Sequence, residues 1–180
     1  MDIFNNIFAY DLNSKQKQIF NDLILSEPYF KAIATKDYNE IKNCLADMKT
    51  KYDTPVNDNN KEYKKDMIYY LRYKIGLYIS CFMIDDTDIF EQIYLPLLNF
   101  NMFNEKEENV IFDILSYNKK FDLLDIVIGH SIQDRYKCGI PFKFDLYKEI
   151  KLREQTFQLV AILQTYKHYK RLYKLDGNEL

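Results

Sequence analysis

Scarcity of glycine and proline is the feature that most restricts the fold of this chain. Only 4 Gly and 4 Pro occur among its 180 residues. Tight hairpin turns and phosphate-binding loops need residues that adopt positive φ, and glycine is the usual choice. Hydrophobic residues make up 47% of the chain, which is enough for a packed core. We therefore predict a folded, mostly helical protein and not a hairpin-rich sandwich or a Rossmann fold.

Hydrophobic periodicity divides the chain into helices. Apolar residues at steps of three or four mark one buried face of a helix. The longest predicted helix is apolar nearly all round in its second half, so we expect it to be central, with Gly76 as a close-packing position. The predicted helices are a short one after Ser14, Pro28–Lys36, one capped by Asp37, Lys61–Met83, Ile89–Phe100 with a kink at Pro96, Glu105–Tyr117, Phe121–His130, Phe144–Ile150 and Arg153–Lys174.

Domain organisation follows from length and from one polar loop. A chain of 180 residues matches one ordinary domain. We interpret residues 1–180 as a single helical domain, with N-terminal helices in 1–52 and a main helical bundle in 61–174. The predicted fold is all-α: a single-domain bundle of about seven to nine helices that includes stacked helical hairpins.

Catalytic and metal-binding patterns are missing from the sequence. Cys44, Cys81 and Cys138 are far apart, so neither a disulfide framework nor a thiolate metal site is predicted. His130 falls at a predicted helix end, where a cap is expected, and His168 lies on a predicted solvated face. No zincin, nucleotide-binding or hydrolase motif occurs. We therefore predict a protein that is not an enzyme and needs neither a metal ion nor a cofactor.

The location of the protein is predicted from what the sequence lacks. Its N-terminal residues show no basic segment followed by an apolar one, and its longest near-apolar run is about half a membrane span. We expect a cytoplasmic protein without a membrane partner.

Charge is distributed unevenly, although the net charge is only −2. Residues 82–125 contain ten acids and three bases, whereas residues 151–174 contain six bases and one acid. In the basic segment the tyrosines continue an apolar seam, so its bases are predicted to form an ordinary solvated face. Nucleic acid is therefore not the expected partner.

The acidic segment provides the candidate binding residues. Carboxylates are favoured near helix N-termini, which explains many of these acids without any function. If two successive hairpins place their starts at a common side, the same acids form a rim that attracts a basic partner. Both interpretations stay open at this stage. The predicted partner-binding residues are Asp85, Asp86, Asp88, Glu91, Asp122 and Asp125.

The order of elements resembles a known family. The resemblance spans roughly residues 61–174 and rests on the segments Met67–Ser80 and Asp85–Tyr94, the hairpin Val110–Ile128, the segment Gly139–Tyr147 and the final Tyr-rich helix. These are similar to the all-helical PoNi-type immunity proteins of bacterial polymorphic-toxin systems. The resemblance implies a helical, non-catalytic protein that binds a cognate toxin, often a nuclease, in the producing cell and blocks it.

The alternative function is that of a helical protein that modulates a host or another partner, of viral or ankyrin-like type, by holding a partner helix in a groove. In both hypotheses the partner is a protein, and in the first hypothesis that protein is a cognate toxin. The sequence does not predict the oligomeric state.

Overall fold

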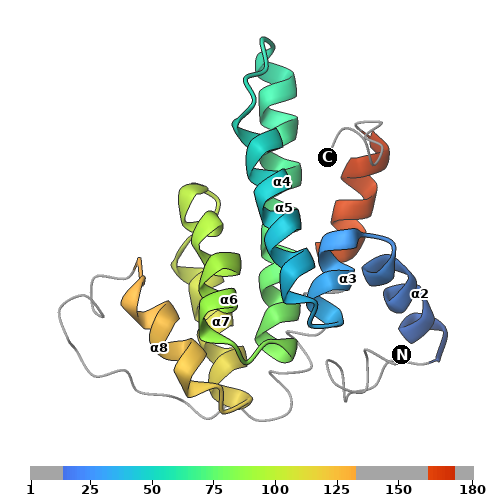
Figure 1. Cartoon of the computed structure of the whole chain (residues 1–180). Helices are drawn as coiled ribbons and strands as arrows, with labels where there is room; N and C mark the ends of the chain where they lie inside the picture. The colour runs from blue at the N-terminus through green and yellow to red at the C-terminus, as the bar shows by residue number, and fades with distance from the viewer. Residues whose placement is uncertain (1–13, 133–161, 173–180) are drawn as a thin grey trace.

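The computed structural model describes residues 14–132 and 162–172, and every regular element within them is helical (Figure 1). The all-α prediction is confirmed. The predicted helix Phe144–Ile150 lies outside the described residues, as does the first part of the one predicted from Arg153. The elements are α2 (Ser14–Leu25), α3 (Pro28–Ala34), α4 (Tyr38–Asp53), α5 (Asn59–Met83), α6 (Thr87–Tyr94), the 3₁₀ helix η1 (Leu95–Asn99), α7 (Glu105–Tyr117), α8 (Phe121–Gly129) and a helical segment over 162–172.

Helix α5 occupies the centre of the molecule. It contacts α3, α4, α6, α7 and η1, and the buried side chains of these elements form one hydrophobic core. In Figure 1, α2, α3 and the segment 162–172 lie on one side of α5, and α6, α7 and α8 lie on the other. From Ile68 to Met83 nearly every residue of α5 is buried. This all-round burial explains why its second half is apolar on every face.

At Gly76, α5 packs directly against the side chain of Tyr29 on α3. A Cβ atom added there would lie 2.5 Å from Cε1 of Tyr29, whose side chain is fully buried. No ordinary Cβ contact is that short, so only glycine leaves room for the tyrosine ring. The prediction that Gly76 serves close packing is confirmed.

Side-chain caps fix where several helices begin. A cap accepts a hydrogen bond from a backbone N–H group that the first turn would otherwise leave unpaired. The cap predicted at Asp37 is confirmed, since its carboxylate accepts from the N–H of Glu40 at 3.1 Å. The other side-chain caps are Asp58 for α5, Asp86 for α6 and Asn104 for α7.

The segment around Pro96 differs from the prediction. The sequence predicts one kinked helix over Ile89–Phe100, but α6 ends at Tyr94 and the chain continues as the 3₁₀ helix η1. Proline has no N–H to donate to the preceding turn, and its ring crowds the carbonyl four residues earlier. A tighter 3₁₀ turn accommodates both effects.

None of the helices in the described ranges combines the length and the apolarity needed to cross a lipid bilayer.

Candidate functional site

Helices α6 and α8 start at the same end of the molecule. They pack against each other, and Lys120, the residue before α8, donates from Nζ to the carbonyl of Ile84, just before α6, at 3.0 Å. The same Nζ lies 3.3 Å from Oδ1 of Asp85. The structure therefore brings the N-terminal ends of two helices from successive hairpins together, and with them the acids of both starts.

The predicted acids have different local roles at this end. Asp86 caps α6 and accepts from the N–H of Ile89 at 2.9 Å. Asp88 and Asp122 lie in the first turns of α6 and α8, where the helix dipole favours a negative charge. Asp125 lies three residues after Asp122 on the same face of α8. All four are exposed.

Asp85 is compensated by lysines. Besides Lys120, the Nζ atom of Lys36 lies 4.0 Å from its carboxylate. Asp86, Asp88, Asp122 and Asp125 have no ion-pair partner among the described residues. We call Asp86, Asp88, Asp122 and Asp125 the acidic edge.

Glu91 pairs with a histidine and is therefore not counted in the acidic edge. Its Oε1 lies 2.8 Å from Nε2 of His130, the residue that follows α8. His130 therefore sits at a helix end, as expected from the sequence, and it joins the end of α8 to the middle of α6. A carboxylate in such a pair is less available to an outside partner than the acidic edge.

Glu108 on α7 is a buried carboxylate that the sequence does not single out. It is completely buried, and its carboxylate accepts from the hydroxyl of Ser131 at 2.6 Å and from the N–H of Ile132 at 3.0 Å. The hydroxyl of Tyr94 lies 3.5 Å from the same carboxylate. These bonds fasten the chain after α8 to α7. Glu108 shares a helical stripe with the buried Ile111, at a spacing that could have revealed its burial.

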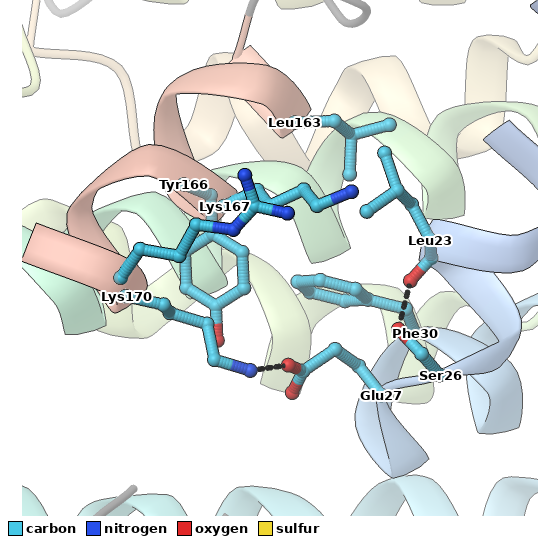
Figure 2. Close-up of a pocket in the computed structure, with 9 residues that line it drawn as sticks. Leu23, Ser26, Glu27, Phe30, Leu163, Tyr166, Lys167 and Lys170 are labelled. Carbon is cyan, nitrogen blue, oxygen red and sulfur yellow. Dashed lines mark hydrogen bonds and ion pairs between the residues drawn. The ribbon is translucent and has the colours of Figure 1, made fainter. Parts of the chain in front are cut away.

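A second buried carboxylate lies on the other side of α5. Glu27, directly before α3, is 8% exposed, and its Oε2 lies 3.9 Å from Nη2 of Arg72 on α5, which is 6% exposed. Lys170 donates from Nζ to Oε1 of Glu27 (Figure 2). The prediction that the bases of the last helix are simply solvated is therefore wrong for Lys170, because Glu27 is buried beside it.

Two of the hollows on the surface of the described residues have a mostly apolar lining. One, of about 340 Å³, lies where the segment 162–172 faces α2 and α3, beside Glu27 (Figure 2). The other, of about 630 Å³, is lined by α4, α5 and η1, and we call it the α4–η1 groove. Its apolar lining includes Leu45, Tyr52, Leu95, Pro96, Leu98 and Phe100, and its polar lining includes Lys42, Lys49 and Asp53.

Neither described thiol is activated as a nucleophile. Burial raises the pKa of Cys81 to about 12, and burial together with Glu40 raises the pKa of Cys44 to about 11. Thiolates are therefore disfavoured at both positions. Cys138 lies outside the described residues. Within the described part of the chain, no three His, Cys, Asp or Glu side chains are grouped closely enough to hold a metal ion.

Comparisons of the chain with protein-family models, with curated proteins and with solved structures find no match.

Proposed function

We propose that this chain is a non-catalytic binding protein whose acidic edge recognises a basic protein partner. The observation that carries the proposal is the common end of α6 and α8, where four carboxylates are exposed and have no ion-pair partner among the described residues. Two packed helices hold these charges in fixed positions. A partner that presents lysines or arginines gains both steering and orientation from such a surface.

The partner class comes from the family resemblance. PoNi-type proteins neutralise a cognate toxin in the cell that makes it, and the toxin is often a nuclease. A nuclease needs a basic face to hold phosphates, and an acidic edge placed on that face blocks substrate while it captures the enzyme. We therefore propose an immunity protein that neutralises a toxin, with no cofactor and no reaction of its own.

The experiment uses the product of the gene adjacent to the one for this chain. We expect that product to slow growth when expressed alone and to be neutralised when this chain is co-expressed. The informative variant combines Asp88→Lys, Asp122→Lys and Asp125→Lys. It leaves the ion-paired Asp85 and the α6 cap Asp86 in place, so the side-chain cap and the ion pairs at this end of the described residues are kept. Association measured at low salt should slow by at least about tenfold.

A matched control carries the same change in charge away from the acidic edge. Reversal of Asp47, Glu62 and Glu105 to lysine alters three carboxylates of α4, α5 and α7 and should leave association within about threefold. Equal loss in both triple variants would mean that net charge, and not the acidic edge, determines binding. Unchanged association in the first variant would refute the acidic edge as the docking surface.

The α4–η1 groove favours a second candidate function. Its apolar lining suits the apolar face of a partner helix, as in other helix-in-groove complexes. Leu95 is 37% exposed in this lining, so Leu95→Gln changes the groove with little effect on folding. If Leu95→Gln abolishes binding of a partner that the acidic-edge variant still binds, a helix-binding modulator is favoured over a toxin inhibitor.

A further inference from the structure

The pocket beside Glu27 has a lining that the proposed function does not use. Leu23 from α2, Phe30 from α3 and Leu163 from the segment 162–172 form its apolar part. Figure 2 shows Lys167 and Lys170 on the segment opposite Phe30. At about 340 Å³ the pocket matches the small end of ligand sites in proteins, which are mostly apolar with a few placed polar groups.

Positive charge is in excess around this pocket. Glu27 contributes the negative charge of its lining, and Lys170 together with Arg72 already compensates it. Lys167 and Arg171 are exposed, line the pocket and have no ion-pair partner in the described ranges. An arginine can hold a carboxylate through two parallel N–H bonds, and a lysine adds a point charge.

Buried polar atoms without partners lie at the same place. Tyr166 lines the pocket and is 3% exposed, yet its hydroxyl has no hydrogen-bond partner among the described residues. Nε and Nη1 of Arg72, which contacts Glu27, are buried and unpartnered as well. Native proteins leave few such groups without water or ligand, so each needs an explanation. Figure 2 shows the hydroxyl of Tyr166 beside Glu27 and Lys170, so these polar atoms belong to the buried charge cluster around Glu27 and not to a ligand.

From the cavity, its apolar lining and its two unpaired cations we infer that this pocket binds a small amphipathic anion, an aliphatic carboxylate. The carboxylate head lies between Lys167 and Arg171, and the alkyl chain rests on Leu23, Phe30 and Leu163. This site is separate from the acidic edge and does not depend on it.

The test is calorimetric titration of the full chain with octanoate, 1-octanol, octyl phosphate and acetate. Octanoate should bind at least about tenfold more tightly than 1-octanol, because a charge-assisted hydrogen bond adds to the apolar contact. Shortening the acid should weaken binding by about fourfold per methylene while the chain stays in the pocket. Acetate, which lacks the apolar body, should not bind measurably.

The informative variant is Lys167→Gln with Arg171→Gln, two exposed positions whose change does not threaten folding. Octanoate affinity should fall about tenfold, to the level of 1-octanol. The matched control, Lys61→Gln with Lys106→Gln, removes two exposed charges from α5 and α7 and should bind octanoate as the unmodified chain does. The inference is overturned by no octanoate binding, by equal binding of octanoate and 1-octanol, by tighter binding of octyl phosphate, or by unchanged affinity in the Lys167/Arg171 variant.

Discussion

On the α3 side of α5, Glu27 is 8% exposed and contacts two cations, Arg72 and Lys170. On the α6–α8 side, Asp85 also contacts two cations, Lys36 and Lys120, but its side chain is 75% exposed. The two carboxylates have similar partners and differ in burial. Water screens the ion pairs of Asp85 and not those of Glu27, so loss of the carboxylate should cost far more stability at Glu27 than at Asp85.

The largest loss of stability should come from removing the buried carboxylate of this pair, Glu27. Glu27→Ala leaves the buried guanidinium of Arg72 without its carboxylate, and we expect a loss of about 3 kcal/mol in the free energy of unfolding. Asp85→Ala removes an exposed carboxylate with the same number of cationic partners and should cost at most about 0.5 kcal/mol. Urea denaturation of both variants measures the difference. Similar losses would show that burial does not separate the two sides.

The two helical glycines provide the next contrast. Gly76→Ala forces a Cβ atom into the fully buried ring of Tyr29 and should cost about 2 kcal/mol, the usual penalty of overpacking a core. Gly129, at the end of α8, has no atom within 4 Å of an added Cβ. Gly129→Ala should be neutral or stabilising by up to about 0.5 kcal/mol, since alanine favours a helix over glycine. Thermal unfolding of both variants checks this, and a destabilised Gly129→Ala would contradict it.

High pH should separate buried from exposed ionisable groups. Burial raises the pKa of Cys81 to about 12 and that of Tyr73 to about 12, so both stay protonated in the folded chain at pH 10. In the unfolded chain the pKa of a thiol is about 8.5 and that of a phenol about 10. Stability is therefore intact below about pH 8 and falls as pH rises, and each group contributes about 1.4 kcal/mol per pH unit once the pH exceeds its pKa in the unfolded chain, so the thiol dominates the loss up to about pH 10.

Urea denaturation at pH 8, 9 and 10 measures this slope. Cys81→Ala is the control, because it removes one of the groups and should flatten the loss between pH 9 and 10. A slope that Cys81→Ala leaves unchanged would contradict the assignment of the thiol to this effect.

Features set by neighbouring residues could be predicted from the sequence. The Asp37 cap depends on residues in the first turn of its own helix, and Gly76 stands out because it lies in an otherwise bulky helix. The all-α class follows from the same local patterns. The sequence predicts a disturbance at Pro96, but a kinked helix and a 3₁₀ turn both accommodate a proline, so local pattern does not decide between them.

The buried carboxylates depend on contacts distant in sequence. From the sequence, Glu27 is predicted to lie at the end of a helix, directly before a proline. Its partner Lys170 lies 143 residues further along the chain, so no local pattern reveals their contact. From the sequence, Glu108 is a first-turn acid of α7, whereas in the structure it accepts hydrogen bonds from residues 131 and 132. The shared end of α6 and α8 was only a conditional expectation, since helix periodicity does not fix how two hairpins are oriented in space.

The smallest effect should come from the pair that joins α6 to α8. Glu91 and His130 are 40% and 38% exposed, and a double-mutant cycle with Glu91→Gln and His130→Ala should give a coupling of at most about 0.5 kcal/mol, which decreases with added salt. The parallel arrangement of the two helices then rests on their buried apolar faces, including Ile93 of α6 and Val127 of α8. A coupling above about 1.5 kcal/mol would mean instead that charge pairs hold this end of the molecule together. In that case a basic partner would compete with His130 for Glu91, and binding would loosen the surface that it recognises.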